Sequence, residues 1–331
     1  MATISDVAAL AGVSTATVSR ALNGKPTVAP DLVARVLAAA AELGYRPNGL
    51  ARSLRRQVTA VVALVISDVE NPFFTAIARG VEDTAQAAGY SVMLCNADED
   101  AVKERQYVDA AVQERVAGVI ISPTGTPATA AALLDSGTPV VAVDRPLAGA
   151  RCDTVLVDSR LAATQATEHL IAQGYQRIGC VTGPAGVPTA DDRLAGYHDG
   201  IAAAGRRVSQ RLVRRCEYKA AGAERAGESL LGEREPPDAI LVGNSVMAVG
   251  VLKALARGAL RPGRDVGIVS FDDAPWATLV DPPLTVVAQP AYEIGTLAAD
   301  MLLARIGTRG DEPKTATLNA RLLVRGSSRR H

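Results

Sequence analysis

The sequence predicts an α/β protein in two parts: an all-α helix-turn-helix head, followed by a two-lobed body of parallel sheets flanked by helices. Residues 3–22, TISDVAALAGVSTATVSRAL, show the apolar spacing of two short helices joined by a tight turn. From residue 60 onward, short β-rich runs alternate with helical segments. The chain has 331 residues, of which 48% are hydrophobic, so its length is sufficient for two or three domains.

The first helix is delimited by a capping pair and a glycine. Thr3 and Asp6 form the [ST]-x-x-[DE] arrangement that opens a helix. The apolar stripe that follows consists of Ile4, Val7, Ala8 and Ala11. Gly12 predicts the end of this helix. Helices commonly end at a residue with a left-handed backbone conformation, which glycine adopts at little energetic cost.

The second helix keeps its apolar residues on one face and leaves a polar face outward. Ser14 can cap this helix, and Val18, Ala21 and Leu22 face inward. The residues left pointing outward are Thr15, Ala16, Thr17, Ser19 and Arg20. Short hydroxyls, a methyl group and an arginine suit the base edges and phosphates of a major groove. The pattern therefore predicts duplex DNA as a partner.

A third helix completes the head, which we place at residues 1–46. Residues 31–44, DLVARVLAAAAELG, carry an amphipathic stripe that can close a three-helix unit. Pro30 predicts the start of this helix and Gly44 its end.

Residues 47–58 form a predicted linker. Pro47 prevents the third helix from continuing, and Asn48 can cap a short new helix that runs to Leu54. A helix of this length does not hold by itself in water, so the linker is expected to become ordered only on a partner.

The distribution of charged residues also separates the head and linker from the body. Residues 1–56 hold seven basic and three acidic side chains, a net charge of +4, which leaves −4 for the rest of a chain with a formal net charge of zero. A basic head on a slightly acidic body is typical of a protein that binds nucleic acid through the head.

The body, residues 59–331, contains two series of predicted buried strands. The first comprises 60–66, 91–95, 118–122 and 139–144; the second comprises 177–183, 212–218, 238–243 and 265–273. Helical segments between such runs indicate parallel sheets covered on both faces. We expect one lobe at about 59–160 plus 290–325 and a second at about 161–289, with the C-terminal segment crossing back to the first.

Several classes of protein are disfavoured. No G-x-S-x-G, P-loop, G-x-G-x-x-G or metal-spaced His/Cys group is present, so we expect no catalysis, no cofactor and no resident metal. The four scattered cysteines predict buried thiols in a reducing cytoplasm. No apolar run is long enough to span a membrane, and Met1 leads directly into a polar capped helix rather than a signal peptide.

The chain resembles the LacI/GalR family of bacterial transcription regulators. The strings that carry the resemblance are TISDVAALAGVSTATVSRALNG, GYRPNGLARSLR, SDVENPFF, VDRP, RLAGY, FDD followed by PPLTVVAQP, and LLVRGSS. They occur in family order and cover nearly the whole chain. The resemblance implies a homodimer that binds a pseudo-palindromic operator, and a body like the type I periplasmic sugar-binding proteins.

The resemblance also implies roles for residues of the head. Thr15, Ala16 and Arg20 are expected to read bases, with Arg20 bidentate to a guanine or, alternatively, on a phosphate. The expected phosphate contacts or supports are Thr17, Ser19, Asn23 and Lys25.

The linker resembles the family's hinge helix, of which two copies meet in the minor groove. Leu54 matches the residue that wedges into the central base step, where a bulky apolar side chain kinks the duplex. The accompanying contacts implied by position are Asn48, Ala51, Arg52 and Arg55.

In the body, the resemblance implies a cleft for a small effector, a sugar or related polyhydroxylated metabolite. The matching positions are Asn71, Phe73, Phe74, Asp144, Arg145, Thr189, Arg193, Glu217, Asn244, Asp272 and Gln289. Aromatic faces stack on rings, and paired carboxylate and guanidinium groups hold vicinal hydroxyls. Many relatives have an aromatic near Glu217, and an offset of one residue would place Tyr218 there instead, so either residue can line the cleft.

The implied mechanism is allosteric, with effector binding in the cleft coupled to operator binding by the paired heads. Whether the effector loosens or tightens operator binding, and whether the protein represses or activates at a given promoter, is not encoded in these motifs. No leucine heptads follow LLVRGSSRRH, so we expect a dimer rather than a tetramer.

The wedge role of Leu54 can be tested directly. Leu54→Ala is expected to weaken operator binding, because the smaller side chain cannot unstack the central base step. Effector binding, measured by calorimetry on the same preparation, should be unchanged. Equal operator affinity of Leu54→Ala and the parent in a fluorescence-anisotropy titration would exclude the wedge.

Overall fold

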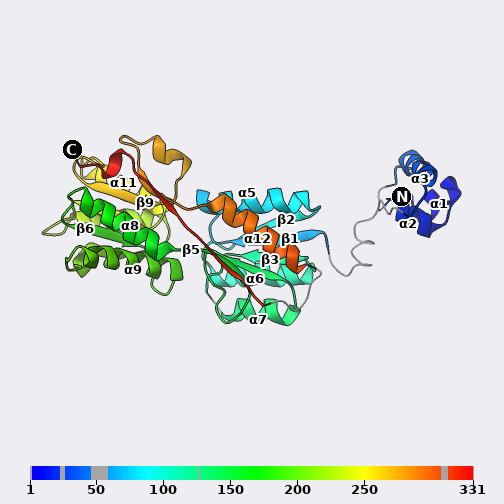
Figure 1. Cartoon of the computed structure of the whole chain (residues 1–331), viewed down its shortest axis with the longest axis horizontal. Coiled ribbons are helices and arrows are strands. Elements are labelled where there is room, and N and C mark those ends of the chain that lie inside the picture. Colours follow the sequence, from blue (N-terminus) through cyan, green and yellow to red (C-terminus); the bar gives the residue numbers. More distant parts are fainter. Residues whose placement is uncertain (1, 23–26, 46–58, 126, 307–311, 331) are drawn as a thin grey trace. The chain divides into compact units, whose positions relative to one another are not determined.

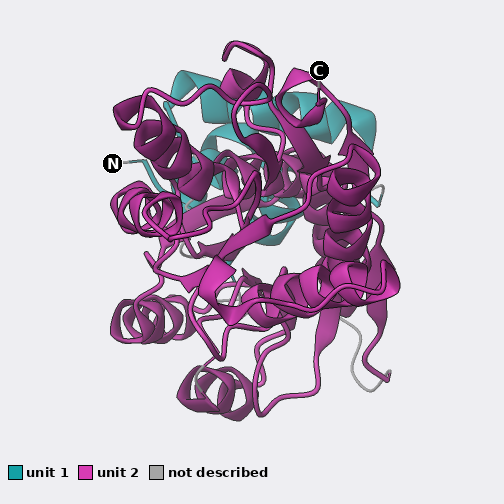
Figure 2. Ribbon diagram, turned by 90° about the vertical axis from the view of Figure 1, so that its left-hand side faces the viewer, with its two compact units in different colours: residues 1–59 teal, residues 60–331 magenta. Residues whose placement is uncertain are grey.

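The computed structural model describes residues 2–22, 27–45, 59–125, 127–306 and 312–330. The chain forms two compact units, residues 1–59 and 60–331, which Figure 2 distinguishes by colour. Each unit is described by itself.

The head contains α1 (Ile4–Ala11), α2 (Thr15–Leu22) and α3 (Pro30–Glu42). The predicted capping box is present: the Thr3 N–H donates to Asp6 Oδ2 at 2.7 Å, and the Asp6 N–H donates to Thr3 Oγ1. Gly12 ends α1 with a φ of 63°, in the left-handed region. The helix predicted at 31–44 begins one residue earlier and ends two residues sooner, because the chain at Leu43 and Gly44 forms the closing turn.

A small apolar core closes the three helices of the head. Its fully or nearly buried members are Val7, Ala8, Ala11, Val18, Ala21, Val36, Ala39 and Ala40. Arg35 on α3 donates through Nη2 to the Ala11 carbonyl oxygen at 2.5 Å, which satisfies a carbonyl at the C-terminal end of α1. Packing and this bond together fix the angle at which α2 is presented.

The first lobe of the body is built on a six-stranded parallel sheet in the order β11-β5-β4-β3-β1-β2. Its strands are β1 (Val61–Ile66), β2 (Ser91–Asn96), β3 (Gly118–Ile121), β4 (Val140–Val143), β5 (Asp153–Val157) and β11 (Thr315–Leu318). Helices α5 (Pro72–Ala87) and α12 (Ala291–Arg305) cover one face, and α6 (Ala101–Gln113) and α7 (Pro127–Ser136) cover the other. Figure 1 shows α5 and α12 side by side, although they are far apart in sequence.

The second lobe repeats this architecture in the order β12-β10-β9-β8-β6-β7, with only the β10–β12 pair antiparallel. Its strands are β6 (Ile178–Thr182), β7 (Val213–Arg215), β8 (Ala239–Val242), β9 (Gly267–Phe271), β10 (Thr285–Ala288) and β12 (Arg321–Leu323). Helices α8 (Ser159–Ala172) and α9 (Pro188–Ala203) cover one face, and α10 (Ala220–Leu231) and α11 (Ser245–Arg257) the other. Short 3₁₀ turns lie at Gln210–Leu212, Pro275–Thr278 and Gly326–Ser328.

The α/β fold class is confirmed, and all of the strands predicted from apolar runs are present. The lobe boundaries need one correction at the C-terminus. The range 290–325 was assigned to the first lobe, but β12 pairs with β10 in the second sheet. The chain therefore passes between the lobes after β5, after β10 and again between β11 and β12.

Close contact between α5 and α12 yields a prediction about stability. A Cβ added at Gly295 on α12 would lie 2.2 Å from the Ile77 carbonyl oxygen on α5, a separation that backbone movement alone can relieve. Gly295→Ala is expected to lower the free energy of unfolding by about 1–3 kcal/mol through overpacking. Urea unfolding followed by circular dichroism measures this change.

Gly258→Ala is the matched control, since the nearest atom to an added Cβ there is 3.5 Å away and φ is −78°. An equal loss of stability in both variants would contradict the close packing of α5 on α12.

Candidate functional site

The outward face of α2 carries the residues predicted to read bases. Thr15, Ala16 and Arg20 are exposed, while Val18 and Ala21 are buried against the other helices of the head. Thr17 and Ser19 are half-buried. Ser14 Oγ accepts the Thr17 N–H at 3.1 Å and lies 2.9 Å from Thr17 Oγ1, so Thr17 also takes part in the helix cap. This face is available to a groove, as the sequence predicts.

The remaining predicted DNA contacts lie outside the described residues. They are Asn23, Lys25, Asn48, Ala51, Arg52, Leu54 and Arg55. Their roles remain predictions from the family resemblance.

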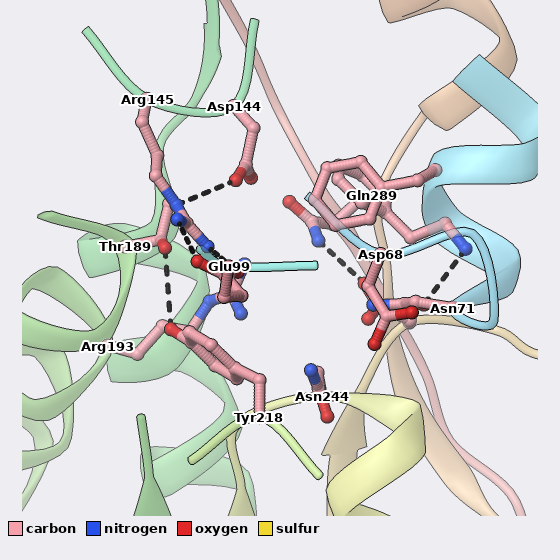
Figure 3. Close-up of a pocket in the computed structure, with 13 residues that line it drawn as sticks. Asp68, Asn71, Glu99, Asp144, Arg145, Thr189, Arg193, Tyr218, Asn244 and Gln289 are labelled. Atoms are coloured by element: carbon pink, nitrogen blue, oxygen red, sulfur yellow. Dashed lines mark hydrogen bonds and ion pairs between the residues drawn. The ribbon is translucent and has the colours of Figure 1, made fainter. Parts of the chain in front are cut away.

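The cleft of the body is a pocket that both lobes line. The lining residues are Asp68, Asn71, Phe73, Phe74, Glu99, Asp144, Arg145, Thr189, Arg193, Tyr218, Asn244, Asp272 and Gln289. Figure 3 shows side chains from both lobes converging on this space. Every predicted cleft residue except Glu217 is brought together here.

The aromatic wall of the pocket is set by a helix cap. Asn71 Oδ1 accepts the Phe73 N–H at 3.0 Å and so begins α5 at the edge of the pocket. Phe73 and Phe74 then pack edge to face, with their ring centroids 5.1 Å apart. Asn71 also contacts the second lobe, where Ser245 Oγ donates to Asn71 Oδ1 at 3.5 Å.

Arg145 follows β4 and is held by two carboxylates. Its terminal nitrogens donate to Glu99 Oε1 at 2.7 Å and to Glu99 Oε2 at 2.8 Å, and its Nε lies 3.2 Å from Asp144 Oδ2. Burial by itself would lower the pKa of Arg145, but the Glu99 hydrogen bonds and the Asp144 charge outweigh it and raise that pKa. Arg145 therefore stays charged and fixed inside the pocket.

Arg193 approaches from α9 on the second lobe. Its Nη1 donates to the Gly243 carbonyl oxygen at 2.6 Å, and its guanidinium carbon lies 4.3 Å from the centroid of the Phe271 ring. The Arg193 Nε is buried and has no hydrogen-bond partner among the described residues. A hydroxyl oxygen of a ligand could satisfy such a donor.

Asp272 ends β9 as Asp144 ends β4, each with a left-handed backbone, φ 71° and 66°. Gln289 Nε2 donates to Asp272 Oδ1 at 2.6 Å. Burial raises the pKa of both aspartates, and the nearby arginines oppose that rise. Both carboxylates point into the space where parallel α/β sheets bind ligands, at the carboxyl ends of their strands.

Tyr218, and not Glu217, lines the cleft. Glu217 is exposed and Tyr218 is 7% exposed. The chain turns tightly at Tyr218, where the Lys219 N–H donates to the Glu217 carbonyl oxygen at 2.7 Å. The Tyr218 hydroxyl lies 3.5 Å from Thr189 Oγ1, and its ring lies 5.6 Å from the Arg145 guanidinium carbon. The expectation for Glu217 is thus corrected, and the pocket gains an aromatic from the second lobe.

Sequence reasoning missed Asp68 and Glu99. Both follow strands of the first sheet, β1 and β2, at the same carboxyl edge that led to Asp144. Asp68 even lies within the SDVENPFF string, from which only Asn71, Phe73 and Phe74 were assigned to the cleft, whereas Glu99 lies in none of the quoted strings. Lys219 of the second lobe bridges to Asp68 at 2.9 Å and to Asp98 at 2.7 Å, so an ion pair also joins the lobes beside the pocket.

Among the residues that the structure describes, no helix combines the length and apolarity that a bilayer crossing requires. The same residues include no group of three or more His, Cys, Asp or Glu side chains placed to hold a metal ion.

Comparisons with known proteins agree with this geometry. Residues 3–48 match the model for "Bacterial regulatory proteins, lacI family", and residues 59–325 match "Periplasmic binding proteins and sugar binding domain of LacI family". The ribose operon repressor of Escherichia coli K12 is 35% identical over 330 residues, 99% of this chain and 100% of that protein.

Solved structures show the same fold. A putative ribose operon repressor from Burkholderia thailandensis is 37% identical, with a TM-score of 0.72 over 80% of this chain and 98% of that one. The lac repressor dimer bound to operator and an anti-inducer is 26% identical, with a TM-score of 0.87 over 99% of both chains. The protein belongs to the LacI family of bacterial regulatory proteins, and is thus a DNA-binding transcriptional regulator controlled by a small effector.

Replacing Arg193 is expected to weaken ligand binding in the cleft without affecting the head. Arg193→Met should weaken sugar binding about 10- to 100-fold, because hydrogen bonds to charged groups contribute roughly 1.5–3 kcal/mol. Titration calorimetry measures the sugar affinity, and anisotropy of a labelled operator measures DNA binding.

Arg160→Met is the matched control, since Arg160 is 59% exposed and pairs with Asp199 away from the pocket. Unchanged sugar affinity in Arg193→Met would show that the cleft residues have been wrongly assigned.

Proposed function

We propose that the protein is a repressor that binds a pseudo-palindromic operator as a homodimer, and that its effector is a monosaccharide of about pentose size bound in the cleft. The observation that carries the effector proposal is the pocket itself: aromatic rings from both lobes surround two arginines, buried aspartates and side-chain amides.

The chemistry of the lining favours a polyhydroxylated ring. Phe73 and Phe74 from the first lobe and Tyr218 from the second offer apolar surface to the C–H faces of a sugar. The carboxylates of Asp144 and Asp272 can accept hydrogen bonds from hydroxyls, and Arg145 and Arg193 can donate to them. Because the lining holds both donors and acceptors, it can satisfy both the hydrogens and the oxygens of sugar hydroxyls.

The relatives support the same ligand class. Both the Escherichia coli protein and the Burkholderia thailandensis structure described above carry the name ribose operon repressor. The lac repressor structure contains a dimer on its operator, which supports the dimer and the palindromic site for this chain. We further propose that the protein acts in the cytoplasm by binding alone and has no catalytic activity.

The effector proposal is tested with a panel of D-ribose, D-xylose, D-glucose, cellobiose and hypoxanthine. A pentose is expected to raise the melting temperature by mass action and to change operator affinity about 5- to 150-fold, the usual range of allosteric coupling. Differential scanning fluorimetry and operator anisotropy give the two readouts. A response to cellobiose or hypoxanthine alone, with none to either pentose, would overturn the proposal.

Two neighbouring positions provide a matched pair of variants for the same assays. Tyr218→Ala removes an aromatic from the pocket and is expected to weaken pentose binding at least tenfold, whereas Glu217→Ala alters an exposed side chain and should bind as the parent does. Equal loss in both would contradict the pocket wall as described.

A further inference from the structure

Glu99 lies in a turn of unusual backbone between β2 and α6. Asp98 and Glu99 are consecutive non-glycine residues with left-handed φ values of 57° and 56°. The turn is held to the end of β1, where the Ala97 N–H donates to the Ile66 carbonyl and the Glu99 N–H to the Ser67 carbonyl. Backbone of this kind costs roughly 1–3 kcal/mol per residue and persists where surrounding contacts impose it.

The two carboxylates of this turn have different partners. Asp98 pairs with Lys219 of the second lobe at 2.7 Å, whereas Glu99 forms both of its hydrogen bonds to Arg145 within the first lobe. Figure 3 shows Glu99 between Arg145 and the centre of the pocket. The turn therefore places one carboxylate at the junction of the lobes and the other against the arginine that a ligand would meet.

Arg145 is more than neutralised by this arrangement. Its side chain is 4% exposed and contacts two carboxylates, Glu99 through both terminal nitrogens and Asp144 near Nε. The Pro123 carbonyl oxygen lies 3.5 Å from Nη1 as a further acceptor. A guanidinium shared in this way can still donate to a neutral hydroxyl, but it offers little net attraction to an anion.

The net charge of the whole pocket also disfavours an anionic ligand. Its described lining contains four carboxylates, those of Asp68, Glu99, Asp144 and Asp272, against the two guanidinium groups of Arg145 and Arg193. Beside the pocket, Lys219 is shared between Asp68 and Asp98. With Lys219 and Asp98 included, the formal charge is two negative charges in excess, in a site where burial strengthens every Coulombic interaction.

We propose that Glu99 is the residue that makes the cleft reject phosphorylated and other anionic sugars and accept neutral ones. It does so by cancelling the charge of Arg145 while holding the guanidinium in place for hydroxyl recognition. The inference rests on the proposed function in taking the ligand to be a sugar. Glu99 is thus a specificity-determining residue for charge, which no motif position indicated.

The test compares Glu99→Gln with the parent chain, using D-ribose, D-ribose 5-phosphate and inorganic phosphate as probes. Glutamine keeps an oxygen acceptor for Arg145 but removes the negative charge. We expect Glu99→Gln to bind ribose 5-phosphate or inorganic phosphate at least tenfold more tightly than the parent does, by titration calorimetry at fixed ionic strength. Ribose affinity should fall only severalfold, because one of the two bonds to Arg145 is lost.

Glu217→Gln is the matched control, since it removes a neighbouring but exposed carboxylate that does not line the pocket. Glu99→Asn is a second variant, because asparagine tolerates left-handed backbone well and guards against failure to fold. A merely structural role for Glu99 predicts a loss of affinity for all three probes and no gain for anions.

The outcomes separate the two proposals. Ribose binding by the parent with no gain in anion affinity in either Glu99 variant would overturn the role of Glu99 and leave the monosaccharide proposal intact. No pentose binding by the parent, together with phosphate binding gained in Glu99→Gln, would support Glu99 and overturn the pentose. An equal gain in Glu217→Gln would show a general charge effect and overturn the assignment to Glu99.

Discussion

A cluster of opposite charges, buried where the carboxyl ends of two parallel sheets converge, is the interaction on which the effector cleft depends. The Arg145 guanidinium is held between Glu99 and Asp144, and Arg193 lies close enough to Asp272 to affect its pKa. Buried charges are tolerated only when they are paired and hydrogen-bonded. The positions of these side chains are therefore tightly constrained before any ligand arrives, which is the preorganisation that a recognition site requires.

The backbone contributes to that constraint at a cost. Asp98, Glu99, Asp144 and Asp272 all adopt left-handed φ values, a conformation that favours glycine, and all follow strands at the cleft edge. Each conformation is retained because a specific contact holds the residue: Lys219, Arg145 or Gln289. Of the six described non-glycine residues with left-handed φ, these four thus lie at the cleft edge, and the other two, Arg115 and Ala259, lie in the turns after α6 and α11.

Contacts across the cleft indicate how ligand binding can be coupled to the arrangement of the lobes. Ser245 of the second lobe donates to Asn71 of the first, and Lys219 of the second pairs with Asp68 and Asp98 of the first. A ligand that contacts Asn71 and Asp272 together binds more tightly to a conformation in which the two lobes lie at one particular separation. Such differential affinity is the only way in which a ligand can shift a conformational equilibrium.

Local sequence determined much of this protein. The capping box at Thr3, the left-handed Gly12 and the apolar periods fixed the helices of the head, because these features act within one or two helical turns. Apolar runs likewise predicted the central strands, since a strand covered on both faces needs little else to identify it. Motif positions located most of the cleft lining, from Asn71 to Gln289.

Only the tertiary structure decided the rest. The choice of Tyr218 over Glu217 depends on which side chain of the turn after β7 faces the pocket, and the return of β12 to the second sheet depends on pairing with a distant strand. The pairing of Glu99 with Arg145 joins residues 46 positions apart. Charge balance in the cleft is a sum over such distant partners, so no window of sequence contains it, and it became visible only when the folded chain brought the side chains together.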